Sequence, residues 1–374
     1  MIIPMSAPDI TDAETSMVTQ VLKTPFLSIG PMLNRFEEGI AQYVGAAHAV
    51  AVNSGTSGLH LCVRALGIGE GDVVVTTPFS FVASTNCILY ERAKPVFVDI
   101  DAETLNIDIA KLRATLEALR DRGIRPKAVL PVHVFGQPCD MAPIIEMARA
   151  YGFAVIEDAC EAIGAEYLGH RVGTLGSAGV FAFYPNKQMT TGEGGVIVTN
   201  DNQIAEMCRS MRNQGRDKTG AWLKHDCLGY NYRMDEMSAA LGIAQLGRIE
   251  ELLTKRAQVA KWYSDRLGSM PALRVPWISP STTRMSWFVY VIRLAPGLDK
   301  DGVMATLEGQ GIPTRPYFSP IHLQPFMRQM LGCTEGDFPV TEEVAKSALA
   351  LPFSSVMTES EVDYVCERLA DAVR

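Results

Sequence analysis

Short, Val-rich segments recur along the first 200 residues of the chain. Most of them are apolar at consecutive positions rather than at alternating ones, which is typical of strands that are covered on both faces. They are too short for helices, and their β-branched residues favour an extended backbone. The pattern therefore predicts strands over 48–54, 72–77, 95–101, 128–134, 154–159, 179–185 and 195–200.

Segments with apolar residues at helical spacing separate many of these strands. They are Leu59–Leu66, Ile109–Arg122, Ala142–Tyr151 and Ile204–Met211. The alternation of strands and helices predicts an α/β fold, with a mainly parallel central sheet and helices on both of its faces. Ligands of such sheets bind beyond the C-terminal ends of the strands, so we expect the chemistry there.

The second half of the chain changes character after an irregular, Gly-rich stretch at 213–222. A long helical stretch follows at 235–267, and Asp235 can cap its start. We expect this helix to bridge a large α/β domain, residues 1–248, and a smaller α+β domain, residues 249–374. The smaller domain is expected to hold strands near 272–276 and 287–294 and helices near 300–310, 340–350 and 358–372.

Composition and charge exclude several classes of protein. Hydrophobic residues make up 47% and charged residues 20% of the chain, and its net charge is −8, which argues against disorder and against an extended nucleic-acid surface. No stretch of about 18 apolar residues and no secretory pattern occurs, so no membrane association is expected. The eight cysteines are scattered, without metal-ligand spacing. We expect a cytoplasmic protein with reduced thiols and no metal site.

Two of the predicted strands end in residues that can carry chemistry. The strand 154-AVIEDA-159 places Glu157, Asp158 and then Glu161 at the ligand edge, although an acid there can also cap a helix. In 181-FAFYPNKQMTTGEGG-195, Lys187 follows an aromatic, apolar strand. An amine in such surroundings suits Schiff-base chemistry with an aldehyde, whereas the alternative is a surface lysine in a loop.

Two other strands are followed by groups that could bind a phosphate or stack on a flat ring. In 53-NSGTSGLHL-61, Thr56 and Ser57 lie at the start of a helix, where backbone N–H groups can bind an anion or can serve only as a cap. The sequence of this turn matches neither the Walker phosphate-binding loop nor the Gly-rich fingerprint of dinucleotide-binding proteins. In 78-PFSFVAST-85, Phe79 and Phe81 can present a ring for stacking or can pack in the core.

Taken together, these groups indicate one cofactor. A phosphate cradle, a stacking ring, a carboxylate and a lysine at strand ends of one sheet match the four needs of pyridoxal 5′-phosphate. Its phosphate and ring must be held, its pyridine nitrogen needs a carboxylate to stay protonated, and its aldehyde needs a lysine.

Longer motifs carry a resemblance to a known family. The chain resembles the DegT/DnrJ/EryC1/StrS aminotransferases, which act on nucleotide-linked keto sugars and have aminotransferase fold type I. The resemblance covers nearly the whole chain. It rests on 27-LSIGPMLNRFE-37, 53-NSGTSGLHL-61, 131-PVHVFGQPCDM-141, 156-IEDACEAIGAEYLGHRVG-173, 181-FAFYPNKQMTTGEGG-195, 229-GYNYRMDEMSAALG-242 and 315-RPYFSPIHLQPF-326.

The resemblance implies roles for individual residues. Lys187 matches the Schiff-base lysine, and Asp158 matches the carboxylate on the pyridine nitrogen. Asn231 matches a residue that reaches the cofactor phosphate of a neighbouring subunit, which implies a homodimer with shared active sites. The remaining matches are the phosphate-binding turn at Thr56 and Ser57, the stacking ring of Phe81, and the sugar-nucleotide site at Tyr317 and His322.

Two positions depart from the commonest family pattern. Glu161 stands where many relatives have Gln or His near the cofactor's phenolic oxygen. Two negative groups there repel each other unless one is protonated or Glu161 turns away. Ala182 stands where many relatives have a phosphate-binding Ser, so one hydroxyl contact is missing. Neither change touches Lys187 or Asp158.

The resemblance implies transamination between L-glutamate, which leaves as 2-oxoglutarate, and a keto sugar attached to a nucleoside diphosphate. The stretch 229-GYNYRM-234 resembles relatives that aminate C4 of a 4-keto-6-deoxy sugar more than those that act at C3. Three alternatives remain. A sugar dehydratase of the same fold would have histidine in place of Lys187. An amino-acid transferase or lyase would not need the 315–326 stretch, and a non-catalytic regulator would not need Lys187.

Overall fold

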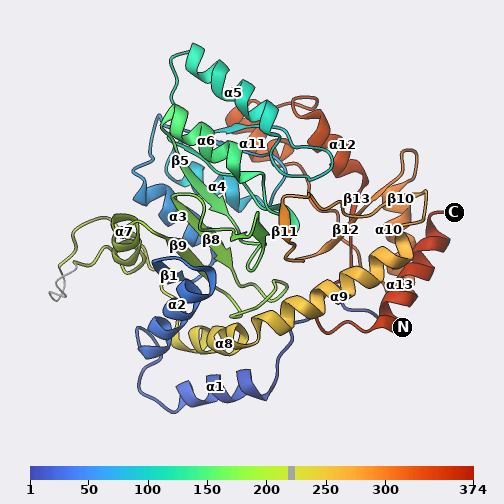
Figure 1. Cartoon of the computed structure of the whole chain (residues 1–374), viewed down its shortest axis with the longest axis horizontal. Helices are drawn as coiled ribbons and strands as arrows, with labels where there is room; N and C mark the ends of the chain where they lie inside the picture. The colour runs from blue at the N-terminus through green and yellow to red at the C-terminus, as the bar shows by residue number, and fades with distance from the viewer. Residues whose placement is uncertain (218–223) are drawn as a thin grey trace.

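A computed structural model describes residues 1–217 and 224–374 (Figure 1). Its largest sheet has seven strands in the order β1-β9-β8-β5-β4-β2-β3. Only β9 runs against the other strands, because it is antiparallel to both of its neighbours, β1 and β8. The predicted, mainly parallel sheet is confirmed. Its strands are β1 (His48–Val52), β2 (Val73–Thr76), β3 (Lys94–Phe97), β4 (Ala128–Val129), β5 (Ala154–Asp158), β8 (Ala178–Ala182) and β9 (Gly195–Thr199).

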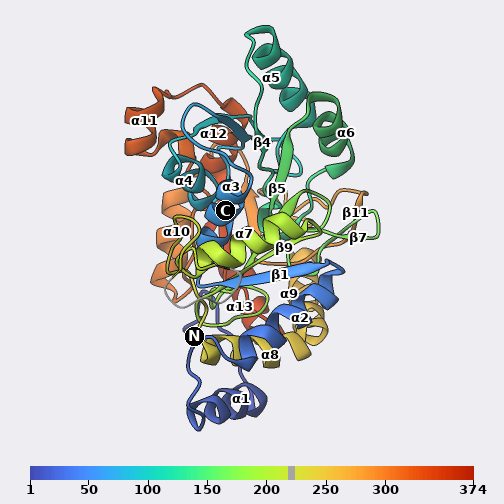
Figure 2. The same ribbon diagram turned by 90° about the vertical axis from the view of Figure 1, so that its left-hand side faces the viewer.

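Helices cover both faces of this sheet, which explains why its strands are apolar at consecutive positions (Figure 2). Alternate residues of each strand enter two different cores; Val155, for example, lies in one and Ile156 in the other. The first core packs against α2 (Pro31–Val44), α5 (Ile109–Asp121), α6 (Met141–Tyr151) and α8 (Glu236–Gly247). The second packs against α3 (Gly55–Ala65), α4 (Ala83–Tyr90) and α7 (Asn202–Arg212).

A smaller antiparallel sheet, β10-β12-β13, forms the centre of a second unit. Helix α9 reaches it from the large sheet, as Figure 1 shows. Ile3 also belongs to this core, so the N-terminus packs beside the C-terminal helix. The predicted division at residue 248 remains a prediction. The elements are β10 (Leu273–Arg274), β12 (Tyr290–Leu294), β13 (Ala348–Leu351), α9 (Ile249–Leu267), α10 (Lys300–Gly309), α11 (Pro325–Leu331), α12 (Pro339–Ser347) and α13 (Glu359–Ala372).

Several short elements complete the fold. A three-stranded sheet, β11-β6-β7, joins the two halves of the chain. No helix in the described residues is long and apolar enough to cross a bilayer. The short elements are β6 (Glu166–Tyr167), β7 (His170–Arg171), β11 (Thr282–Arg284), α1 (Asp12–Leu22) and the 3₁₀ turns Val134–Gly136 and Ile321–Leu323.

The structure corrects two of the predicted helices. The stretch 235–267 is two helices, since α8 ends at Gly247 and α9 begins at Ile249. Asp235 caps α8 as predicted, because its side chain accepts hydrogen bonds from the N–H groups of Met237 and Ser238. The helix expected over 340–350 ends at Ser347, and the chain continues as β13. The predicted irregular stretch 213–222 lies partly outside the described residues.

Helix α1 is attached to α8 through one buried carboxylate. The two oxygens of Glu14 accept hydrogen bonds from the N–H and hydroxyl of Thr11, from Gln245 and from Arg248. Burial alone would raise the pKa of Glu14, but these hydrogen bonds outweigh it and lower the pKa to about 2. Ionised Glu14 therefore stabilises the fold above its ordinary pKa of 4.5, and this contribution is lost as the pH falls toward 2.

We expect Glu14→Gln to lower the free energy of unfolding at pH 7 by about 1–3 kcal/mol, because buried donors lose their acceptor. Denaturant titrations at pH 7 and pH 3 measure the effect, which should shrink at the lower pH. Glu117→Gln, on the exposed face of α5, is the control. A loss that does not change with pH would contradict this account.

Candidate active site

The candidate residues gather at one edge of the large sheet, where β1, β2, β5 and β8 end and β9 begins. After β1, the first turn of α3 lies unusually close to the ends of β5 and β8. A Cβ added to Gly55 would lie 2.7 Å from the Cβ of Ala182 and 2.9 Å from the Sγ of Cys160. The glycine therefore permits the start of α3 to reach the same edge as Asp158 and Glu161.

The start of α3 has the geometry of an anion-binding turn. Ser54 caps the helix, and its hydroxyl accepts the N–H of Ser57 at 3.1 Å. The Ser57 hydroxyl donates to Asn53 Oδ1 at 2.7 Å, which fixes the turn, and Thr56 is partly exposed. Backbone N–H groups in a first helical turn have no partner within the helix and attract negative charge. Ala182, beside Gly55, adds no hydroxyl.

Asp158 lies buried at the end of β5. Its Oδ2 accepts a hydrogen bond from the Ser84 hydroxyl at 2.6 Å, and its Oδ1 accepts one from the N–H of Cys160 at 3.2 Å. The Ser84 hydroxyl also lies 2.7 Å from that of Ser80. No helix follows β5 directly, so Asp158 is not a helix cap. A carboxylate accepts about four hydrogen bonds, so Asp158 has capacity for a further donor.

The neighbouring acid, Glu157, has a different role. Successive side chains of a strand point to opposite faces, and Glu157 therefore points away from Asp158. It is fully buried, and it accepts the N–H groups of Gly173, Leu175 and Gly176 at 2.6–2.7 Å. The Nε2 atom of His133 lies 3.0 Å from Oε2 of Glu157. Glu157 holds the turn before β8 and is structural.

Lys187 lies in the turn after β8 with its amine directed into the protein. Its side chain is only 13% exposed, so the alternative of a surface lysine does not hold. The Nζ atom lies 3.7 Å from the centre of the Phe288 ring and 3.5 Å from Glu161 Oε1. An aromatic face and a carboxylate thus contact the amine from two directions.

Glu161 faces Lys187 rather than turning away from the site. Its second oxygen accepts the N–H of Phe135 at 2.9 Å. Burial raises the pKa of Glu161 above its ordinary value, and this outweighs the opposing effect of the charge on Lys187. The site therefore contains a carboxyl group that binds a proton more readily than an exposed one, next to the amine.

Aromatic rings form one wall of the site. The ring of Tyr317 stacks on those of Phe135 and Phe288, with ring centres 6.1 Å and 6.4 Å apart. Burial and the nearby charge of Glu161 raise the pKa of Tyr317. Sequence reasoning missed Ser84 and Phe288, although Ser84 lies within the quoted segment 78–85 and Phe288 within the strand predicted near 287–294. Phe135 was missed although it lies within the quoted motif 131–141.

The other predicted site residues lie around this centre or apart from it. Phe79 is buried in the core, whereas Phe81 is 62% exposed and its carbonyl accepts the Ser84 hydroxyl. Asn231 is exposed, on a segment tied to the end of β1 by a hydrogen bond from the N–H of Asn53 to Tyr232 O. His322 is fully buried against Phe338 and Glu342, so its substrate contact stays a prediction.

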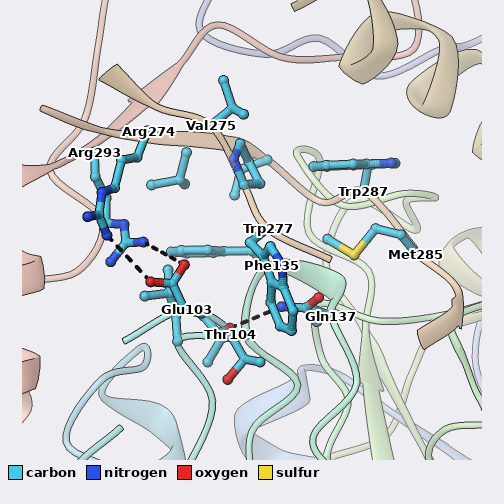
Figure 3. Close-up of a pocket in the computed structure, with 15 residues that line it drawn as sticks. Glu103, Thr104, Phe135, Gln137, Arg274, Val275, Trp277, Met285, Trp287 and Arg293 are labelled. Carbon is cyan, nitrogen blue, oxygen red and sulfur yellow. Dashed lines mark hydrogen bonds and ion pairs between the residues drawn. The ribbon is translucent and has the colours of Figure 1, made fainter. Parts of the chain in front are cut away.

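A cavity behind the aromatic wall does not compete as a cofactor site (Figure 3). Its volume is about 30 Å³, room for about one water molecule. Phe135, Trp277 and Trp287 line it, and at one end Arg274 and Arg293 point toward Glu103. In the described residues, no group of three or more His, Cys, Asp or Glu could hold a metal ion.

Comparisons with known proteins define the class. Among solved structures, the PseC aminotransferase of Helicobacter pylori matches with a TM-score of 0.93 at 26% identity, over 100% of this chain and 99% of that one. That protein is an aminotransferase involved in the biosynthesis of pseudoaminic acid. The expected aminotransferase fold type I is thereby confirmed, and it implies pyridoxal phosphate as cofactor.

The chain belongs to the DegT/DnrJ/EryC1/StrS aminotransferase family, whose model matches residues 8–370. The GDP-perosamine synthase of Caulobacter vibrioides is 38% identical over 98% of this chain and 97% of that protein. The spore coat polysaccharide biosynthesis protein SpsC of Bacillus subtilis is 36% identical over 100% of this chain and 97% of that protein. The family membership confirms the expected enzyme class, a pyridoxal-phosphate-dependent aminotransferase.

The two acids of β5 should respond differently to amidation. Glu157→Gln places an NH₂ group against backbone donors and should cost about 3–5 kcal/mol of unfolding free energy. Asp158→Asn faces a Ser84 hydroxyl that can rotate to accept, so the loss should stay within about 1 kcal/mol. Denaturant titration of both variants tests the distinction. Equal losses of unfolding free energy in the two variants would contradict the assignment of a structural role to Glu157 alone.

Proposed function

We propose that this aminotransferase transfers an amino group to a keto sugar attached to a nucleoside diphosphate. The observation that carries the proposal is the buried amine of Lys187, held between Phe288 and Glu161 at the sheet edge that also carries Asp158. The relatives support the substrate class, since one is a GDP-perosamine synthase and another a spore coat polysaccharide biosynthesis protein.

The residues at this edge fit pyridoxal phosphate. Asp158 has acceptor capacity for the pyridine N–H, and the first turn of α3, with Thr56 and Ser57, can bind the phosphate. The amine of Lys187 can bind the aldehyde, and Phe81 follows β2 at the same edge. When bound, the cofactor supplies an electron sink and carries the amino group between the two substrates.

Lys187 is the group that moves the proton. In its free form, Nζ can take the proton from the α-carbon of the amino donor and deliver it as a general acid. Glu161 Oε1, at 3.5 Å from Nζ, can hold a proton next to the amine. Asp158, buried and hydrogen-bonded to Ser84, would hold the ring nitrogen by accepting its N–H.

L-Glutamate is the proposed donor, and the resemblance of 229-GYNYRM-234 favours amination at C4 of a 4-keto-6-deoxy sugar. The half-buried ring of Tyr317, stacked on Phe288, lies where it can line the sugar site. Lys187 itself favours transamination over dehydration, because the dehydratases that resemble this family have histidine at that position. The stretch 315–326 favours a sugar nucleotide over a simple amino-acid substrate.

We also propose a homodimer with shared sites. Asn231 is exposed in the single chain, which leaves it free to contact the phosphate in a partner subunit. Exposed apolar side chains on the loops around the site would be buried by a second copy. They are Phe26, Leu27, Ile29, Phe81, Tyr184 and Leu228.

The first test is the absorbance spectrum of the purified protein loaded with pyridoxal phosphate. We expect a visible band that moves to the near ultraviolet when L-glutamate is added. Lys187→Ala should lose the band and lower turnover by at least about 10³-fold, since it removes both the covalent anchor and the proton-transferring group. Lys261→Ala, an exposed lysine on α9, is the control. Normal turnover without Lys187 would refute the assignment.

The substrate class is tested with the amine form of the enzyme. Nucleoside-diphosphate 4-keto-6-deoxy sugars should restore the visible band, whereas the same sugars without the nucleotide should react at least about 100-fold less efficiently, because the remote binding energy is lost. Return of the band with simple 2-oxo acids alone would favour an amino-acid transferase.

A further inference from the structure

Arg256 is a fully buried arginine that the proposed reaction does not use. Its side chain is among the largest that are wholly buried, with 1% of the residue exposed. Within residues 1–217 and 224–374, no carboxylate forms an ion pair with it. Burying an unpaired charge is costly, and a well-packed apolar side chain is usually at least as stable at such a position. The arginine therefore needs an explanation other than packing.

Backbone carbonyl groups take the place of the missing carboxylate. One terminal nitrogen of Arg256 donates to Lys187 O at 2.6 Å and to Asn186 O at 3.2 Å. The other donates to Phe288 O at 3.1 Å and to Trp287 O at 3.5 Å. The planar guanidinium thus joins two segments, and these are the two that bring the amine of Lys187 and the ring of Phe288 together.

The position of Arg256 along α9 also places it between the two hydrophobic cores of the protein. Leu252 and Leu253, before it, belong to the core of the large sheet, and Val259 and Tyr263, after it, belong to the core of the second unit. Arg256 lies where the helix passes from one core to the other. Burial lowers its pKa to about 10, which still leaves the guanidinium charged at neutral pH.

We propose that Arg256 is a positioning residue for Lys187: it clamps the loop that carries the lysine to the segment that carries Phe288, and thereby holds Nζ in place for proton transfer. The proposal rests on the proposed function, in which Lys187 carries the cofactor. Lysine can replace the clamp only in part, because an ammonium keeps the positive charge but lacks the planar fork that reaches two segments.

The test compares Arg256→Gln and Arg256→Lys with Arg266→Gln, a control on the same helix whose arginine is partly exposed and paired with Asp363 and Glu359. All are loaded with pyridoxal phosphate and reacted with L-glutamate. We expect Arg256→Gln to lower kcat of this half-reaction by about 10- to 100-fold, because a misplacement of about 1 Å has such an effect. KM should change by less than about threefold.

Two further readouts separate positioning from a merely structural role. The isotope effect with α-deuterated glutamate should rise in Arg256→Gln, because proton transfer by Lys187 becomes slower. The pKa of the visible band should rise by about 0.5 unit or more, since a buried positive charge near the lysine is removed. Arg256→Lys should lie between Arg256→Gln and the wild type in kcat, and Arg266→Gln should match the wild type.

The outcomes are distinct. Wild-type kcat, isotope effect and band pKa in a folded Arg256→Gln would overturn the inference, as would a loss confined to KM. If that variant does not fold, Arg256→Lys decides, and wild-type kinetics there would equally overturn it. A wild type without a visible band contradicts the proposed function instead. If the wild type shows the visible band but does not react with L-glutamate, the proposed donor is wrong. The pKa of the band in Arg256→Gln then tests the role of Arg256 by itself.

Discussion

The crossing of segment 286–288 over the loop at Gly136 is the contact on which the site depends. The N–H of Ser286 donates to Gly136 O, and Gln188, next to Lys187, donates to Ser286 O at 3.0 Å. A Cβ at Gly136 would lie 1.6 Å from Ser286 O, so no side chain is compatible with this approach. The crossing brings Phe288 from a distant part of the chain to the amine of Lys187.

Around this crossing, the charged residues that support the site differ from those that are available to react. On β5, Glu157 binds backbone N–H groups on one face of the sheet, while Asp158 keeps acceptor capacity on the other. The same division applies to the two cations, since the hydrogen bonds of Arg256 go to backbone carbonyl groups whereas Lys187 keeps its amine partly accessible. Charged groups that are hydrogen-bonded to the backbone hold the site, and groups with remaining capacity can react.

Sequence reasoning located the strands and the central residues because their signals are local. The apolar runs of the parallel strands and the acid and lysine that follow them are readable without tertiary contacts. It failed where local preference competes with packing. The break between α8 and α9 at Arg248 and the strand after Ser347 follow from contacts with other elements. The case of His322 is different: the motif alone places it at the substrate, the structure buries it beside Glu342, and its substrate contact stays a prediction.

By itself, the sequence determined the fold class and the order of most elements, and it singled out Lys187 and Asp158 as the proposed reactive pair, because hydrophobic pattern and strand-end residues are properties of neighbouring positions. Only the tertiary structure decided what surrounds the amine. Phe288 and Glu161 contact it, and Arg256 holds it from behind through backbone carbonyls. These contacts join residues up to about a hundred positions apart, and no local pattern encodes which face of a distant segment will meet the lysine.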